Sequence, residues 1–154
     1  MQLAEIIIQR IRKEGPISFR DFMDMSLYYP EMGYYTSAGN PIGSKGDFYT
    51  SSTLTPVFGA MIGRQIEEMW KISDSEAFTI IEYGSGTGVL CKSILDFLKT
   101  NKELFDSLNY CIIEKSAYMQ TIEKNLLKEK VSWFNSIAEI PETNCCVLSN
   151  RPLA

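Results

Sequence analysis

The chain has 154 residues, 45% of them hydrophobic, which is enough for one domain able to bury roughly 68–70% of its unfolded surface. A formal net charge of −4 and the absence of a basic stripe argue against a nucleic-acid partner, and no apolar run is long enough to predict a membrane span. The lack of histidine removes the commonest metal ligand, and no pattern of acids or thiols predicts a metal site.

The four cysteines indicate a reducing compartment, because no C-x-x-C spacing or disulfide framework is recognisable among them. We therefore expect a cytoplasmic protein with free thiols. Cys111, Cys145 and Cys146 fall in strand-like runs and are expected to lie in the core.

Two helices are predicted at the start of the chain. Apolar residues recur at helical spacing within residues 1–15, and the acids among them are unlike a secretory signal. A second helix is predicted to begin after Ser18, because Asp21 three positions later forms a pair similar to a capping box, and to end at Pro30.

An aromatic turn and a loop follow these helices. Tyr28, Tyr34 and Tyr35 are expected to be packing aromatics between parts of the chain rather than site residues. Residues 37–53 are rich in glycine, serine and threonine and are predicted to be a loop. A third helix is predicted to begin at residues 55–56, where threonine at the N-cap precedes proline at the first helical position.

Residues 78–89 read F-T-I-I-E-Y-G-S-G-T-G-V and carry most of the functional prediction. The first part is a β-branched run typical of a strand buried on both faces of a parallel sheet. Gly84, Gly86 and Gly88 then allow a sharp turn into a helix, where a ligand can lie directly against the main chain. We predict that these three glycines contact a cofactor.

The spacing of the glycines separates several classes of nucleotide-type ligand. The dinucleotide fingerprint G-x-G-x-x-G would have its third glycine where Val89 stands, and no Gly-Lys-Ser/Thr follows as in a P-loop. The pattern E-x-G-x-G-x-G, with Glu82 two residues before Gly84, is instead what S-adenosylmethionine methyltransferases show. A nicotinamide dehydrogenase stays open as an alternative that Val89 disfavours.

The next strand supplies an acid beside the glycine turn. Residues 108–113 are strand-like, Glu114 closes them, and residues 99–107 before them are expected to include a polar loop. In a β-α-β crossover Glu114 would lie next to Gly84, where its carboxylate can accept hydrogen bonds from both ribose hydroxyls. Glu82 is predicted to orient the methionine amine of the cofactor, directly or through water. The alternative is that both acids are ordinary strand-end residues facing solvent.

The remaining elements complete an α/β pattern. A helix is predicted at residues 117–127, and strands at residues 131–134 and 145–148. The predicted fold is a Rossmann-like sheet, of which residues 76–154 contain the first four strands, after a mostly helical N-terminal region of residues 1–75.

Three motifs resemble the MidA-like family of class I S-adenosylmethionine methyltransferases. They are residues 15–23 (G-P-I-S-F-R-D-F-M), 27–35 (L-Y-Y-P-E-M-G-Y-Y) and 46–51 (G-D-F-Y-T-S). The resemblance runs from about Glu14 to Asn150. It implies S-adenosylmethionine as cofactor and a protein substrate, because mitochondrial members are complex I assembly factors that look like protein arginine methyltransferases.

The same resemblance implies further site residues. Gly46, Asp47, Phe48 and Thr50 would form a loop that closes over the cofactor pocket, and the alternative is a plain surface connector. Independently of the resemblance, Asn150 is a further candidate for cofactor binding, because it follows the fourth strand and α/β sheets place ligand contacts at that edge.

The chain departs from the family pattern at one functional position. Family members have an acid after this asparagine, whereas Arg151 follows Asn150 here, so no catalytic residue is assigned. A seven-stranded methyltransferase sheet needs three more strands, and we therefore expect either a fragment or a degenerate member. An open sheet edge could then pair with a second copy. A non-catalytic cofactor-binding or assembly module is the alternative to an enzyme.

Overall fold

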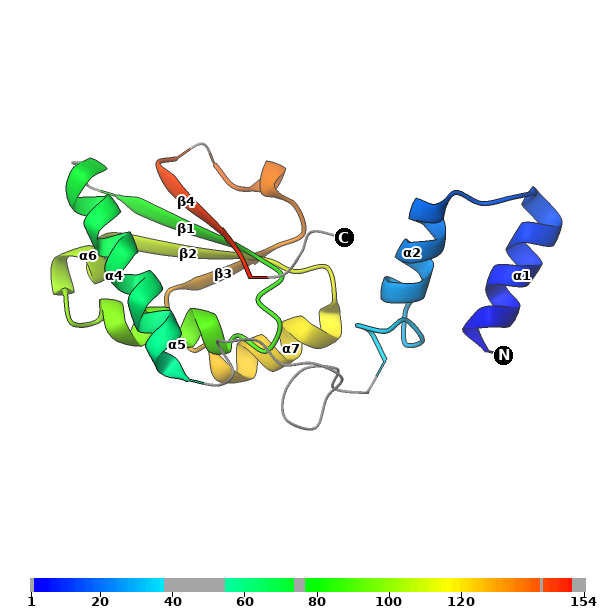
Figure 1. Cartoon of the computed structure of the whole chain (residues 1–154), viewed down its shortest axis with the longest axis horizontal. Helices are drawn as coiled ribbons and strands as arrows, with labels where there is room; N and C mark the ends of the chain where they lie inside the picture. The colour runs from blue at the N-terminus through cyan, green and yellow to red at the C-terminus, as the bar shows by residue number, and fades with distance from the viewer. Residues whose placement is uncertain (1, 38–54, 74–76, 142, 151–154) are drawn as a thin grey trace.

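The computed structural model describes residues 2–37, 55–73, 77–141 and 143–150, and these form two N-terminal helices followed by an α/β unit (Figure 1). The helices are α1 (Leu3–Glu14), α2 (Phe19–Tyr28), α4 (Pro56–Ser73), α5 (Val89–Leu98), α6 (Lys102–Ser107) and α7 (Ala117–Leu126), with a short 3-10 helix η1 (Ile137–Glu139). The strands are β1 (Phe78–Tyr83), β2 (Leu108–Ile113), β3 (Val131–Phe134) and β4 (Cys145–Ser149).

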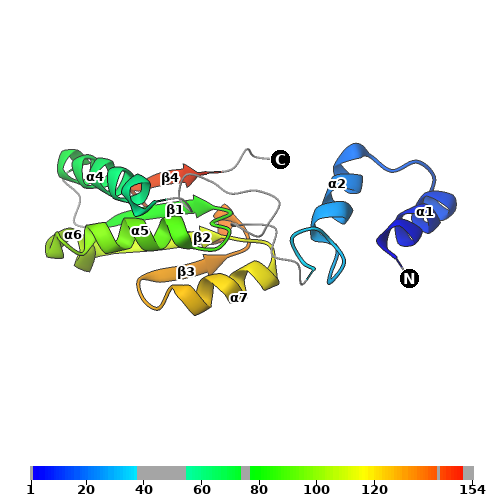
Figure 2. The ribbon, with the colours of Figure 1, turned by 60° about the horizontal axis from the view of Figure 1, so that its bottom comes forward.

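The start of α2 follows from its capping residues. The Ser18 side chain accepts a hydrogen bond from the Asp21 backbone N–H at 3.0 Å, and its hydroxyl donates to the Asp21 carboxylate at 2.7 Å. The helix ends at Tyr28, two residues before Pro30. Figures 1 and 2 show α1 and α2 beyond the carboxyl ends of the strands, to the side of the α/β unit.

The sheet is parallel, with strand order β3-β2-β1-β4, so the predicted α/β fold with four sheet strands is confirmed. β1 pairs with β2 along its whole length, from Phe78 opposite Leu108 to Tyr83 opposite Ile113, and with β4 on its other side. The order of strands reverses between β1 and β4, and open α/β sheets bind ligands at the carboxyl ends of strands beside such a switch point.

The larger hydrophobic core lies between the sheet and the helices α4, α5 and α7, which Figure 2 shows along one face. Successive strand residues point to opposite faces, and Ile80, Tyr110 and Ile112 are completely or almost completely buried in this core. The opposite face holds a smaller cluster around Ile81 and Cys111. Both faces of β1 are therefore covered, as its apolar sequence predicts.

Helices α4 and α5 lie unusually close together because glycines form the contact. A Cβ added at Gly59 would overlap with the Cβ of Ser93, and one added at Gly63 would lie 2.7 Å from Cδ1 of Phe97. Both glycines are buried in the face of α4 that contacts α5. This contact holds α4 against α5.

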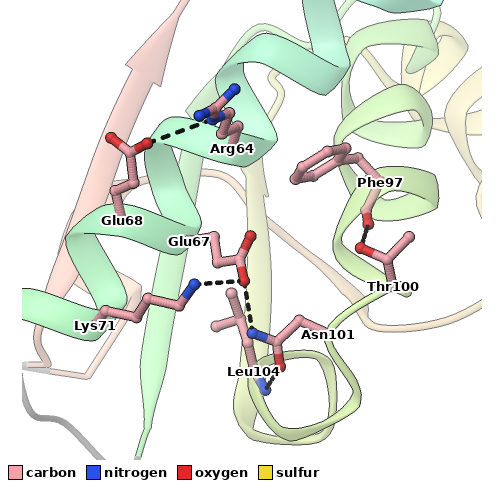
Figure 3. Close-up of polar contacts among 8 residues, drawn as sticks. All are labelled: Arg64, Glu67, Glu68, Lys71, Phe97, Thr100, Asn101 and Leu104. Carbon is pink, nitrogen blue, oxygen red and sulfur yellow. Dashed lines mark hydrogen bonds and ion pairs between the residues drawn. The ribbon is translucent and has the colours of Figure 1, made fainter.

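The segment before β2 contains a helix that the sequence interpretation missed. Asn101 caps α6 by accepting a hydrogen bond from the Leu104 N–H at 3.2 Å, and its amide donates to Glu67 of α4 at 2.8 Å. Lys71 contacts the same Glu67 oxygen at 2.9 Å (Figure 3). The polar loop predicted within residues 99–107 is therefore wrong for α6, because capping and the burial of Leu104 stabilise a short helix there.

The prediction of core thiols holds for Cys111 but is wrong for Cys145, which is exposed, while Cys146 is half-buried. Alternate residues of β4 face away from the main core, and Val147 on that side is 53% exposed. The strand-like run indicated a strand correctly, but its position beside only β1 in the described sheet leaves one side of it open. None of the helices in the described parts of the chain has the length and apolarity needed to cross a membrane.

Candidate functional site

A cavity of roughly 760 Å³ lies between α2 and the carboxyl ends of the strands. Each strand contributes a lining residue at or just after its end: Gly84 from β1, Glu114 from β2, Asn135 from β3 and Ser149 from β4. The volume falls in the range of about 300–1,000 Å³ that small-molecule sites occupy. The cavity therefore has the place and the size of a ligand site in an open α/β sheet.

The facing wall comes from α2 and the turn that follows it. Its lining residues are Phe19, Arg20, Met23, Asp24, Leu27, Tyr28 and Tyr35. The rings of Tyr28 and Tyr35 pack with centroids 5.7 Å apart, and Nζ of Lys115 lies 5.5 Å from the Tyr28 centroid. These tyrosines were expected to pack between parts of the chain rather than to form a site, whereas Tyr28 and Tyr35 pack on each other and also line the cavity.

The glycine turn has a backbone that only glycine adopts without strain. Gly84, Gly86 and Gly88 have φ values of 61°, 65° and 77°, in the left-handed region that costs roughly 1–2 kcal/mol for other residues. A Cβ added at Gly84 would meet nothing within 4 Å, because the cavity opens there. Gly88 precedes α5 and lies against α7, since its added Cβ would be 3.1 Å from Cδ1 of Leu127.

Glu114 lies beside the glycine turn on the adjacent strand. The Gly84 N–H donates to the carbonyl of Ile113 at 2.9 Å, which extends the β1–β2 ladder by one bond. The Glu114 side chain is 7% exposed, and its Oε1 accepts a hydrogen bond from the Ser116 N–H at 2.8 Å. The hydroxyl of Ser116 donates to the Tyr35 carbonyl at 2.6 Å, so the segment that follows β2 is also joined to the aromatic turn after α2.

Glu82 points to the same face of β1 as Ile80, toward the main core. Its side chain is 1% exposed, and its Oε2 accepts a hydrogen bond from the Tyr110 hydroxyl at 2.7 Å. Burial, and then the negative charge of Glu82, raise the pKa of Tyr110 well above its usual value, so this hydroxyl stays a donor. Glu82 is not among the cavity-lining residues, and its contact with a methionine amine stays a prediction.

The other predicted site residues fall into two groups. Asn150 follows β4 and is half-buried, and the cavity is lined by its neighbour Ser149. Gly46, Asp47, Phe48 and Thr50 lie outside the described residues, as does Arg151.

Sequence interpretation missed the third strand end. Asn135, Ser136 and Ile137 follow β3 and line the cavity. The available signal was topological: parallel neighbours end at the same edge of a sheet, so the residues after 131–134 had to lie near Glu114. Among the described residues, no group of three or more acids and thiols could hold a metal ion.

The combined geometry suits a nucleoside-like ligand. A buried carboxylate beside an open backbone can accept ribose hydroxyl hydrogens while the ligand lies against Gly84. Arg20 and Lys115 add cationic groups to the cavity wall, and Asp24 adds a second carboxylate. This mixture of charges suits a ligand that carries charges of both signs.

The sequence model of one protein family matches residues 61–151, and that family is described as "Putative S-adenosyl-L-methionine-dependent methyltransferase". This match favours a methyltransferase over the nicotinamide dehydrogenase that the glycine spacing left open. It also confirms the resemblance to the MidA-like family.

Curated relatives carry more specific names. The protein arginine methyltransferase NDUFAF7 homolog, mitochondrial, of Caenorhabditis elegans is 29% identical over 172 residues, which cover 97% of this chain and 40% of the relative. The human protein arginine methyltransferase NDUFAF7, mitochondrial, is 32% identical over 132 residues, covering 81% and 29%. The chain thus spans no more than about 40% of the length of these relatives.

Two solved structures from Burkholderia thailandensis share the fold. A crystal structure bound to S-adenosyl-homocysteine superposes with a TM-score of 0.72 at 24% identity and covers 94% of this chain and 40% of the other. A native crystal structure gives a TM-score of 0.73 at 25% identity, covering 94% and 37%. The family match over residues 61–151, together with the human relative at 32% identity over 81% of this chain, places the chain in the MidA-like family of S-adenosyl-L-methionine-dependent methyltransferases.

Proposed function

We propose that the cavity binds S-adenosylmethionine and that the whole protein transfers the methyl group to arginine in a protein substrate, in connection with respiratory complex assembly. The observation that carries the cofactor proposal is the position of Gly84 and Glu114 at the same cavity. These two residues follow adjacent parallel strands and line one cavity. The names of the curated relatives support arginine as the acceptor.

The residues present fit the cofactor. The space beside Gly84 would be filled by the Cβ of any other residue, so a ligand can approach the main chain there. Glu114 would accept hydrogen bonds from the ribose hydroxyls, and Asn135 and Ser136 offer amide and hydroxyl groups to the edge of an adenine ring. The apolar side chains of α2 would cover the ligand and exclude water.

When bound, S-adenosylmethionine supplies a methyl group activated by its sulfonium. The chain's own residues therefore need to bind and align rather than to supply strong acid–base chemistry. Guanidinium groups are oriented best by carboxylates, and Asp24 places one on the α2 wall of the cavity. No residue is assigned to activation of the acceptor.

The cofactor proposal is tested by calorimetric titration of S-adenosylhomocysteine into wild type and Gly84→Ala. The added methyl group would project into the cavity without meeting protein atoms, so we expect a loss of affinity of at least tenfold. Gly15→Ala is the matched control, because Gly15 also has a positive φ of 91° and an open Cβ position but does not line the cavity.

Three outcomes decide the proposal. Weak binding only in Gly84→Ala supports it, whereas equal affinities in all three proteins place the ligand elsewhere. Wild type that fails to bind S-adenosylhomocysteine at millimolar concentration contradicts the proposal outright.

A second candidate is a cofactor-binding or assembly module without catalysis. It is favoured by Arg151, which follows Asn150 where the family has an acid. The two functions are separated by incubating the protein and a protein extract with S-adenosylmethionine carrying a labelled methyl group. Cofactor binding without labelled protein supports the module, and a labelled partner with an intact-mass gain of one or more methyl groups supports the enzyme.

Three further proposals concern organisation. The division of the chain at residue 75 stays a prediction. Helices α1 and α2 lie to the side of the sheet, whereas α4, which also precedes residue 75, packs against α5 (Figure 1). The curated relatives are named as mitochondrial, and a cytoplasmic location for this chain stays a proposal that the free thiols support. Pairing of two copies along β4 also stays a proposal, tested by light scattering of wild type and of Val147→Lys.

A further inference from the structure

A buried carboxylate on α7 joins the glycine turn to β3. The Glu123 side chain has no solvent exposure, and its Oε1 accepts a hydrogen bond of 2.6 Å from the Ser85 hydroxyl. Its Oε2 accepts a hydrogen bond of 2.7 Å from Nε1 of Trp133. Neither Glu123 nor Ser85 lines the cavity, so the hydrogen bond between them lies outside the cavity wall.

Such a carboxylate is costly to bury unless its oxygens are hydrogen-bonded. Both of its oxygens have donors at the short distances typical of charge-assisted bonds. Helix α7 also contacts the end of the turn, since a Cβ added at Gly88 would lie 3.7 Å from Cα of Glu123. The helix therefore supports the turn through both a side-chain bond and close packing.

The turn needs such support because of its composition. Ser85 stands between Gly84 and Gly86, and three glycines within five residues leave the unbound chain many conformations to lose. Ser85 gives this segment a side chain whose hydroxyl is held by a buried acceptor. The same acceptor holds Trp133, two residues before the cavity-lining Asn135.

We infer that Glu123 is a positioning residue that holds the glycine turn, through Ser85, in the conformation that receives the cofactor. This inference rests on the proposed function. The hydrogen bond that Ser85 donates to Glu123 can be removed separately from the one that Trp133 donates.

The test compares Ser85→Ala with Trp133→Phe. Each variant removes one donor to Glu123, but only Ser85→Ala releases the turn. We expect Ser85→Ala to raise the dissociation constant of S-adenosylhomocysteine about tenfold, as loss of a charge-assisted bond predicts. We expect Trp133→Phe to lower the melting temperature but to change the dissociation constant by no more than about twofold.

A double-mutant cycle adds the second residue. Glutamine at position 123 keeps one acceptor oxygen where glutamate has two, so Glu123→Gln weakens the bond to one of the two donors. If Glu123 acts through Ser85, Glu123→Gln changes the dissociation constant much less in the Ser85→Ala background than in wild type. Full additivity of the two effects overturns the inference.

Hydrogen exchange of the free protein provides a readout that does not depend on the ligand. Amides of residues 84–88 should exchange faster in Ser85→Ala and at the wild-type rate in Trp133→Phe. Unchanged affinity and exchange in Ser85→Ala overturn the inference while leaving the proposed function standing. Wild type that does not bind S-adenosylhomocysteine removes the proposed function, and exchange alone then decides whether Glu123 anchors the turn.

Discussion

The Tyr110 hydroxyl and the Glu82 carboxylate form a 2.7 Å hydrogen bond inside the main core, where both side chains are almost completely buried. The bond joins β1 to β2 two residues before the glycine turn. It gives the acid of the E-x-G-x-G-x-G pattern a partner within the protein. Glu82 therefore stabilises the strand pair that carries Gly84 and Glu114.

Removal of this donor should destabilise the protein. Tyr110→Phe keeps the ring but leaves the buried Glu82 carboxylate with one donor fewer, which costs about 1–3 kcal/mol. The measurement is the free energy of unfolding by urea, compared with Tyr118→Phe, which removes a hydroxyl from a half-buried tyrosine of α7. Equal losses in the two variants would show that the Tyr110 bond contributes nothing specific.

Several elements follow from local signals in the sequence. The run of residues 78–81 is short, uncharged and rich in β-branched residues, and glycines follow from residue 84, so strand and turn are both specified locally. Helix α6 has a local signal too, in the N-cap Asn101, but a helix of six residues contains too few apolar positions to show a period.

The site was only partly predictable for a different reason. Gly84 and Glu114 follow from the rule that a β-α-β unit places two strands side by side. The wall formed by α2 depends instead on tertiary contacts such as the bond from Ser116 to the Tyr35 carbonyl, which joins residues 81 positions apart. No spacing or periodicity in the sequence encodes such a contact. The exposure of Cys145 likewise depends on what lies beside β4.

Close packing of α4 and α5 leads to a second prediction. Gly59→Ala should lower the free energy of unfolding by about 1–3 kcal/mol, because the new methyl group overlaps with Ser93 and the helices must separate. Thermal or urea unfolding measures this loss. The double variant Gly59→Ala/Ser93→Gly removes the opposing Cβ and should recover part of the stability beyond the cost of glycine in a helix, about 1 kcal/mol. Strict additivity would contradict a direct contact.

The link between α4 and α6 predicts a dependence on pH. Hydrogen bonds from Lys71 and then Asn101 lower the pKa of Glu67 below its usual value of 4.5. A carboxyl with a lowered folded pKa stabilises the protein above its unfolded pKa, and this contribution is lost as the pH falls through the folded value. Glu67→Gln should therefore cost about 1 kcal/mol at pH 7 and progressively less as the pH falls below 4.5.

Urea unfolding of wild type and Glu67→Gln across this pH range measures the effect. Glu68→Gln is the matched control on the next residue, because its partner Arg64 lies 3.5 Å away with both side chains well exposed. We expect a smaller loss for the control at neutral pH. A constant difference between wild type and Glu67→Gln at every pH would contradict the role assigned to the Glu67 charge.

The cysteines should differ in reactivity according to burial. Cys145 is exposed, whereas Cys91 is completely buried in the main core, and burial followed by the charge of Glu82 raises its pKa far above the usual value. Burial also raises the pKa of Cys111 and of Cys146.

Because the thiolate is the reacting form, N-ethylmaleimide should modify Cys145 first and Cys91 only after unfolding. Peptide mass spectrometry over time measures the order, and Cys145→Ser should abolish the fast phase. Modification of Cys91 in the native protein as fast as Cys145 would mean that the core between β1 and α5 opens readily, and the glycine turn that joins these elements would then lack a rigid base.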